Sequence, residues 1–182
     1  VVSRLLRIMG YSVYDTDSEA KRLMESSLEV VQKLSECFGR DIYHNGRLNR
    51  GLLSSRVFGK SDKIVLLNSI VHPVVRFDFY RWSESLNEEI CFVESAILYE
   101  AGFQDTVDAV IMVYAPVELR IQRAMYRDGA SEEQVRARIA AQMDDEEKRR
   151  RADFTVVNDG VQLLIPQLNR IVEQLKTEKF IL

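Results

Sequence analysis

The sequence predicts an α/β fold in which a parallel sheet is flanked by helices. Three short apolar runs support this expectation: residues 90–93, 109–114 and 154–157 are each bounded by charged or polar residues. Such runs are typical of buried strands, and helical patterns separate the last two. Short buried strands that alternate with helices favour a parallel sheet covered on both faces.

The chain opens with a short helical pattern that ends at Gly10, and residues 11–14 then form a predicted short strand. Residues 18–38 carry apolar side chains at helical spacing, which predicts a helix in two pieces that ends at Gly39. The next connector contains Asn45-Gly46, a strong turn dipeptide.

Further helices are predicted for residues 49–58 and 61–70, and a longer one follows His72-Pro73. The block 18–89 contains no convincing strand, so we expect it to form an inserted helical domain. Pro116 suits the first turn of a helix over 116–127.

Helical signals continue to the C-terminus. Ser131 and Gln134 suit a capping box at the start of a helix over 131–143. The last predicted helix covers 161–176 and contains Pro166, which is expected to kink or restart it.

Composition excludes several classes of protein. The 182 residues are 46% hydrophobic with 8 Gly and 3 Pro, which excludes intrinsic disorder and low-complexity or collagen-like chains. The longest apolar runs are far shorter than the roughly 20 residues that span a bilayer. The net charge of −3 gives no general attraction to nucleic acid. With Cys37 and Cys91 interpreted as buried hydrophobic residues, the sequence predicts a cytoplasmic protein without membrane or nucleic-acid partners, and it leaves the oligomeric state open.

Ligands of parallel sheets gather at the carboxyl ends of the strands, and acidic or amide residues stand at these places. Asp15 and Asp17 follow the first strand, Glu94 and Glu100 follow the second, and residues 158–160 (Asn-Asp-Gly) follow the last. A carboxylate there could accept a hydroxyl proton or hold Mg²⁺. Spacing alone favours the alternative that Asp17 or Ser18 caps the following helix. Glu94 is either an acid that positions a metal-bound water or an ordinary polar strand end.

The segment 120–151 is rich in arginine, and Arg123 and Arg127 share one helical face. Arginine forks match phosphate oxygens and stabilise charge during phosphoryl transfer. Because acidic residues are interleaved, we expect most of these arginines to be ion-paired on the surface and one to three to be functional. His72 could be a base or a ligand. The favoured interpretation is a residue at a helix N-terminus whose imidazole nitrogens have hydrogen-bond partners.

Taken together, the ordered motifs resemble the dephospho-coenzyme A kinase family over nearly the whole chain. Residues 13–17 (V-Y-D-T-D) resemble the family's V-I-D-A-D, and residues 45–50 (N-G-R-L-N-R) resemble its D-G-x-L-D-R. The resemblance continues through these segments: 57–58, 72–73, 94–102, 123–128, 136–142, 151–154 and 158–160.

The resemblance implies a P-loop kinase fold that transfers the γ-phosphoryl group of ATP, with Mg²⁺, to the ribose 3′-hydroxyl of dephospho-CoA. It implies a nucleotide-binding core over residues 1–17, 90–122 and 150–182, a CoA-substrate domain over 18–89 and a lid over 123–149. Asp17 matches the catalytic aspartate, and Arg123 matches the arginine at the transferring phosphate. The residues implied for ATP or the lid are Arg127, Arg138, Gln142, Asn158 and Gly160, and those implied for substrate binding are Asp15, Arg47, Leu48, Arg50, His72, Glu94 and Glu100. The metal ligands are not implied.

Two departures from the family pattern stand out. The family's P-loop, G-G-I-G-S-G-K-S, is absent from this chain, which begins at Val1. By the family's spacing we expect the P-loop just upstream, and the 182 residues alone are not expected to be an active kinase. Ala96 and Tyr99 stand where the family often has Pro and Phe. Two alternatives remain open: another small-molecule or nucleotide P-loop kinase, and a non-catalytic module that binds CoA or a nucleotide.

Overall fold

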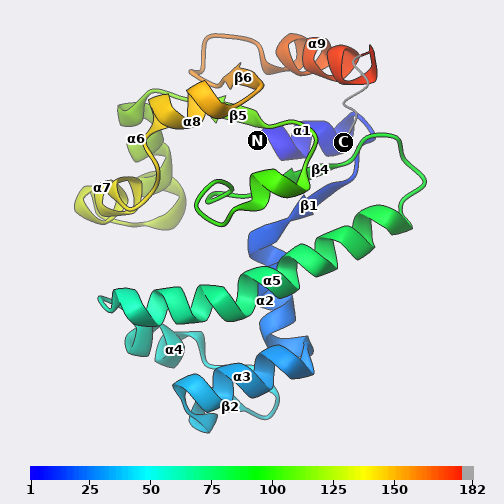
Figure 1. The fold of residues 1–182 in the computed structure, drawn as a ribbon. Helices are drawn as coiled ribbons and strands as arrows, with labels where there is room; N and C mark the ends of the chain where they lie inside the picture. Colours follow the sequence, from blue (N-terminus) through cyan, green and yellow to red (C-terminus); the bar gives the residue numbers. More distant parts are fainter. Residues whose placement is uncertain (178–182) are drawn as a thin grey trace. The chain divides into compact units, whose positions relative to one another are not determined.

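Two units make up the chain in the computed structural model, which describes residues 1–177 (Figure 1). The first unit consists of residues 1–12 and 96–182, and the second consists of residues 13–95. Each unit contains one pair of parallel strands with helices packed against it, as expected for an α/β fold.

In the second unit, β1 (Val13–Asp15) pairs in parallel with β4 (Phe92–Glu94). The register places Asp15 opposite Glu94, so two acidic residues end neighbouring strands. β1 leads directly into α2 (Thr16–Ser26), which is followed by α3 (Leu28–Phe38). The predicted strand and the predicted two-piece helix are therefore confirmed.

A small hairpin follows α3 and a 3₁₀ turn, η1 (Arg40–Ile42). β2 (Tyr43–His44) pairs antiparallel with β3 (Arg47–Leu48). Asn45 and Gly46 both have positive φ, 48° and 77°, as a two-residue hairpin turn requires. The expectation that residues 18–89 contain no strand is therefore wrong here, because two-residue strands are too short to produce an alternating pattern.

The remaining helices of this unit are α4 (Arg50–Val57) and α5 (Ser61–Ser85). The expectation that the chain breaks near His72-Pro73 is wrong, because α5 continues through Pro73. Proline removes one backbone hydrogen bond from a helix. Val71 and Val75 are buried on either side of it, and this packing maintains the helix. Figure 1 shows α5 crossing α2, and the unit's core includes Val30 and Leu34 of α3, both fully buried.

The first unit begins with α1 (Val2–Ile8), which packs against α9 (Leu164–Thr177). After the 3₁₀ turn η2 (Phe103–Thr106), β5 (Ile111–Tyr114) pairs in parallel with β6 (Phe154–Val157). Between these strands the chain forms three helices: α6 (Val117–Asp128), α7 (Glu132–Ala140) and α8 (Asp145–Arg151). The predicted capping box of Ser131 and Gln134 is confirmed at the start of α7.

Two sequence expectations about this unit and the cysteines need correction. α8 was not predicted as a helix, because its seven residues are all charged and carry no apolar periodicity. Cys37 was expected to be buried, but it lies on the exposed side of α3, while Cys91 is partly buried. Within residues 1–177, no helix is both long enough and apolar enough to cross a membrane.

Candidate active site

The carboxyl end of β1 fixes the start of α2 through Asp15. Its Oδ1 accepts hydrogen bonds from the backbone N–H groups of Asp17 and Ser18, both at 3.1 Å, and Ser18 Oγ donates to Oδ2 at 3.0 Å. Asp15 is therefore the N-cap, and the expectation that Asp17 or Ser18 performs this role is wrong. The local arrangement satisfies amides that the first turn of a helix leaves without partners.

Asp17 follows on the first turn of α2 with an exposed side chain. Among the described residues, its carboxylate has no hydrogen-bond or ion-pair partner. The carboxylate of Asp15, in contrast, accepts the hydrogen bonds that cap the helix. The helix dipole favours a negative charge at this place. Asp17 is thus an ionisable group at the end of a parallel strand that the fold leaves available to a ligand.

The two strand ends are tied together by Thr16. Its buried hydroxyl donates a 2.9 Å hydrogen bond to the backbone carbonyl of Glu94. The exposed side chain of Glu94 ends β4 opposite Asp15. The structure therefore brings Asp15, Asp17 and Glu94 to one end of the β1–β4 pair.

Oxygen donors of this kind suit Mg²⁺. In the described part of the chain, no three His, Cys, Asp or Glu side chains are arranged to hold a metal ion by themselves. Mg²⁺ usually binds through one or two carboxylates together with substrate phosphates and water rather than in an all-protein cage. Asp17 and Glu94, with exposed carboxylates at one sheet end, fit that mode of binding.

Sequence reasoning missed a polar cluster behind this strand end. Tyr14, 3% exposed on β1, donates from its hydroxyl to Asp78 Oδ2 of α5 at 2.7 Å. Arg22 of α2 donates from Nη2 to the same oxygen at 2.7 Å and also pairs with Glu19. Burial, with the Asp78 carboxylate beside it, raises the pKa of Tyr14, which stays protonated. No spacing rule reveals this cluster, because residues distant in sequence meet only in the folded unit.

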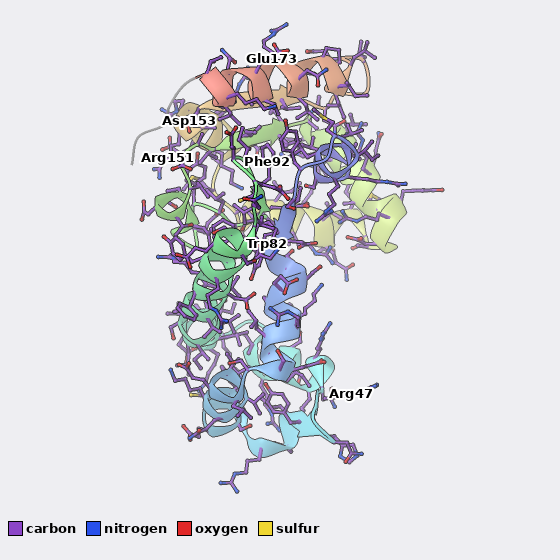
Figure 2. The ribbon with its side chains drawn as sticks, turned by 90° about the vertical axis from the view of Figure 1, so that its right-hand side faces the viewer. Arg47, Trp82, Phe92, Arg151, Asp153 and Glu173 are labelled. Atoms are coloured by element: carbon purple, nitrogen blue, oxygen red, sulfur yellow. The ribbon has the colours of Figure 1, made fainter. Side chains whose placement is uncertain are left out.

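An aromatic group surrounds the same tyrosine. The ring of Trp82 lies 5.3 Å from that of Tyr14, and the ring of Phe79 lies 5.4 Å away at an edge-to-face angle of 70°. Such geometries add to the stabilisation from burial alone. Figure 2 labels Trp82 beside α2.

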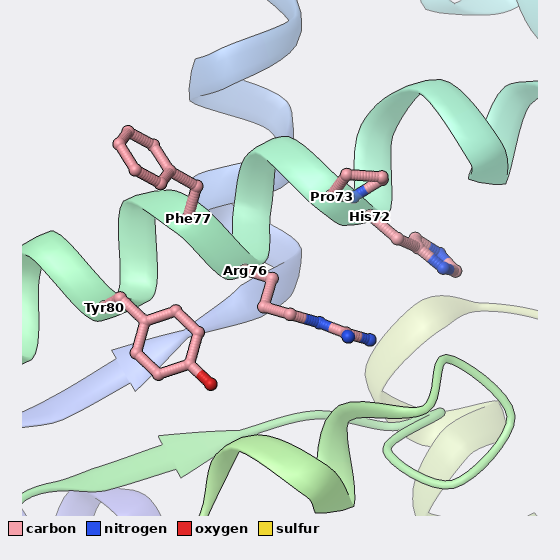
Figure 3. A pocket seen from close by; sticks show the side chains of 5 residues that line it. All are labelled: His72, Pro73, Arg76, Phe77 and Tyr80. Atoms are coloured by element: carbon pink, nitrogen blue, oxygen red, sulfur yellow. The ribbon is translucent and has the colours of Figure 1, made fainter.

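His72 lies inside α5 rather than at a helix N-terminus, so the favoured interpretation of it is wrong. It lines a hollow on one side of α5 together with Pro73, Arg76, Phe77 and Tyr80 (Figure 3). Burial, helped by the nearby guanidinium of Arg76, lowers the pKa of His72. The imidazole is therefore neutral at pH 7.

Three further residues expected at the substrate lie toward the far end of α2. Arg50 Nη2 is 3.3 Å from Glu25 Oε1, and Glu25 is in the last turn of α2, roughly 12 Å along the helix axis from Asp17. Arg47 is exposed on the hairpin, well away from Trp82 in Figure 2. Leu48 is 8% exposed and belongs to the core. The structure does not bring these residues to the strand end.

In the first unit, Arg123 meets the loop after β6. Its Nη1 donates to the backbone carbonyl of Asn158 at 2.8 Å. Gly160 has a φ of +87°, and a Cβ at this position would lie 3.6 Å from Arg123 Nη2. The structure therefore brings Asn158 and Gly160 to the exposed guanidinium of Arg123, and glycine allows the turn to have a conformation that other residues rarely adopt.

Arg127 and Arg138 are joined through Asp128. Arg127 makes two hydrogen bonds to this carboxylate, at 2.7 and 3.0 Å, and Arg138 donates to it at 3.1 Å. These guanidinium groups hold the pKa of Asp128 below its usual value, Arg127 having the larger effect. The acid links the end of α6 to α7, and both arginines remain largely exposed.

Most of the other arginines of the segment are ion-paired, as the interleaved charges predicted. Arg136 pairs with Glu118 and Glu132, and Arg151 pairs with Glu147. Arg120 of α6 makes a partly buried bidentate pair with Asp145 of α8.

Glu100 lies in a second cluster that includes a residue missed by the sequence analysis. Its Oε1 accepts the backbone N–H of Met143 at 2.7 Å and lies 3.6 Å from Nζ of Lys148, which is 8% exposed. Lys148 Nζ is also 3.5 Å from Gln142 Oε1. Glu100 and Gln142 thus meet around a buried ammonium at the connection between α7 and α8. A lysine in a run of charged residues gives no sequence signal for burial.

Comparisons with known proteins agree with one another. The family model described as dephospho-CoA kinase matches residues 1–163. A dephospho-CoA kinase of Bacteroides fragilis is 43% identical over 94% of this chain and 84% of its own length. One from Porphyromonas gingivalis is 42% identical over 98% of this chain and 89% of its own length. A solved structure from Thermus thermophilus is 34% identical with a TM-score of 0.82, covering 96% of this chain and 90% of that one.

Proposed function

The chain belongs to the dephospho-CoA kinase family, and we propose that it transfers the γ-phosphoryl group of ATP to the ribose 3′-hydroxyl of dephospho-CoA. The products are coenzyme A and ADP. The main structural support for this proposal is the carboxylate of Asp17. It is exposed just beyond the end of β1 and has no partner among the described residues.

Asp17 acts as the general base in this proposal. A base must lie within hydrogen-bond reach of the proton it removes, and Asp15 fixes the backbone of the turn that carries the Asp17 carboxylate. The oxygen of the acceptor hydroxyl attacks the γ-phosphorus as its proton passes to Asp17. The bond from phosphorus to the bridging β,γ-oxygen breaks, and ADP leaves with that oxygen.

Arg123 stabilises the charge on the phosphoryl group as it moves. Its guanidinium is exposed and donates to a backbone carbonyl, so its charge is not neutralised by an acid. Arginine forks at transferring phosphates contribute through charge and directed hydrogen bonds. Asn158 and Gly160, in the same loop, contact the nucleotide.

The remaining predicted residues bind rather than react. Arg127, Arg138 and Gln142 belong to the proposed lid over residues 123–149, which closes over ATP. Glu94, with Asp15 behind it, borders the acceptor, and His72, Arg47 and Arg50 bind the CoA portion within the domain 18–89. Leu48 supports that region through its buried side chain, and Glu100 acts through its contacts to the α7–α8 connection. Glu94 would hold Mg²⁺, which would supply positive charge to neutralise the phosphates of ATP.

The proposal is tested with the full-length protein by following ADP formation from ATP. Dephospho-CoA, adenosine, AMP and shikimate are offered separately as acceptors. We expect turnover with dephospho-CoA and little with the others. Preference for another acceptor would assign the chain to a different small-molecule kinase activity, and binding of dephospho-CoA without turnover would make it a non-catalytic module.

A further inference from the structure

We propose that Asp78 is a positioning residue for phosphoryl transfer, because it fixes the direction of the helix that carries Asp17. The proposal rests on the proposed function, since it assumes that Asp17 is the general base. Asp78 lies on α5, and its two partners, Tyr14 and Arg22, lie on β1 and α2.

Both partners converge on a single carboxylate oxygen. Tyr14 Oη and Arg22 Nη2 each donate to Asp78 Oδ2 at 2.7 Å. Charge-assisted hydrogen bonds of this length are stronger and more directional than neutral ones. One acid therefore connects the strand before the site, the helix after it and the long helix α5.

The first turn of α2 is held at its beginning by other contacts. Asp15 caps the helix, and Thr16 Oγ1 bonds to the carbonyl of Glu94. These bonds locate the helix start. Further along, α2 packs against α5 and α3, Leu23 is buried, and Tyr43 Oη donates a 2.7 Å hydrogen bond to the carbonyl of Met24. Arg22 lies five residues beyond Asp17, about one and a half turns along, and its bond to Asp78 is the charged contact between this part of α2 and α5.

Stability alone does not account for the Arg22–Asp78 pair. Arg22 is 51% exposed and Asp78 is 27% exposed. An ion pair with so much solvent access contributes little to the free energy of folding. The buried hydroxyl of Tyr14 does need an acceptor, but a neutral amide oxygen would also satisfy it. The charge on Asp78 therefore has a different use, which is to hold Arg22.

A general base is sensitive to such positioning. Proton transfer requires the carboxylate and the hydroxyl to be within about 3 Å, and a displacement of ~1 Å can cost on the order of 100-fold in rate. A shift of α2 against α5 that includes its first turn would move Asp17 relative to the acceptor without removing any catalytic group.

The experiment compares Arg22→Met, Asp78→Asn and the double variant of the full-length protein. Asn retains an oxygen for Tyr14 but loses the charge that holds Arg22. We expect each single variant to lower kcat roughly 10-fold with KM for dephospho-CoA nearly unchanged, because the effect falls on the reacting geometry. The double variant should be no slower than either single one, since both remove the same link.

Lys33→Gln is the matched control, because it removes an exposed 2.7 Å ion pair, with Glu29 on α3, that does not involve α2. We expect its kcat to equal that of the wild type. If Arg22→Met and Asp78→Asn also leave kcat unchanged, or if their effects multiply in the double variant, the positioning role is wrong.

Hydrogen exchange separates this proposal from the proposed function. The amides of Asp17 and Ser18, bonded to Asp15, should exchange faster in Arg22→Met and Asp78→Asn than in Lys33→Gln and the wild type. Faster exchange in a protein that does not phosphorylate dephospho-CoA would support the link while refuting the kinase activity. Unchanged exchange in an active protein would overturn the link and leave the activity standing.

Discussion

Arg123 reaches from α6 to the loop after β6, where its Nη1 donates a 2.8 Å hydrogen bond to the backbone carbonyl of Asn158. The bond joins the proposed transition-state arginine to the proposed nucleotide loop. Because the acceptor is a neutral carbonyl, a phosphate oxygen can replace it as the stronger partner.

Arg123→Ala is expected to lower kcat by about 10²-fold or more while raising KM for ATP much less, because the charge acts mainly in the transition state. Steady-state kinetics with ATP varied at saturating acceptor measure both. Arg136→Ala is the control, since Arg136 is an exposed arginine paired with Glu118 and Glu132. A change confined to KM would assign Arg123 to ground-state binding.

Asp17→Asn should lower kcat roughly 10²–10⁴-fold and leave the affinity for dephospho-CoA nearly intact, as loss of a general base does. Calorimetric titration and turnover assays separate the two effects. The matched control is Asp62→Asn, which replaces an acid in the first turn of α5. Equal kcat values for the Asp17 variant and the wild type would mean that Asp17 only stabilises the N-terminus of its helix through the helix dipole.

Much of the fold followed from local patterns. The β6 run matched residues 154–157, and Ser131 with Gln134 formed the predicted capping box. Local patterns failed where tertiary packing or helix capping determined the structure. Burial of residues on both sides of Pro73 allows α5 to continue through the proline. α8 is stabilised by its Asp144 cap and by acidic residues at its start and basic residues at its end, which match the helix dipole.

The candidate site was predictable where its residues are close in sequence. Asp15 ends β1, Asp17 lies two residues further on, and the 158–160 loop follows β6, so the rule for parallel sheets points to all three. The Tyr14–Asp78 and Glu100–Lys148 contacts join residues separated by 64 and 48 positions, counted as 78 − 14 and 148 − 100. Tertiary packing creates these contacts, and one sequence carries no signal for them.

Glu100→Ala is expected to lower the free energy of unfolding by about 1–3 kcal/mol, because it removes the acceptor of the Met143 amide and leaves the buried Lys148 ammonium without its acid. Denaturant unfolding measures the change. Adding Lys148→Met should recover part of the loss, since no buried charge then remains unpaired. A double variant less stable than Glu100→Ala would contradict this account.

The same cluster predicts a pH effect. Burial acts to raise the pKa of Glu100, but the Met143 amide and the Lys148 charge outweigh it, so the net pKa is lowered. The stabilisation is therefore present above the usual pKa of a carboxyl group and is lost as the pH falls through the lowered value. The wild type should lose more stability than Glu100→Gln across this acidic range, and parallel pH profiles would contradict the assignment.

His72 predicts a second pH dependence at higher pH. Burial lowers its pKa, so below the usual histidine value of about 6.5 the unfolded chain binds a proton that the folded chain does not. Stability should therefore fall as the pH drops below about 6.5, and His72→Gln should flatten this part of the profile. A profile unchanged by the substitution would show that His72 titrates alike in both states.

The most direct measurement identifies the position of the new phosphate. Full-length protein is incubated with ATP, Mg²⁺ and dephospho-CoA, ADP is quantified, and the product is examined by phosphorus NMR. The proposed function predicts one ADP per product molecule and a new phosphomonoester on the ribose 3′-oxygen, both strongly reduced in Asp17→Asn. A phosphate on another atom, or tight binding of dephospho-CoA without ADP formation, would contradict it.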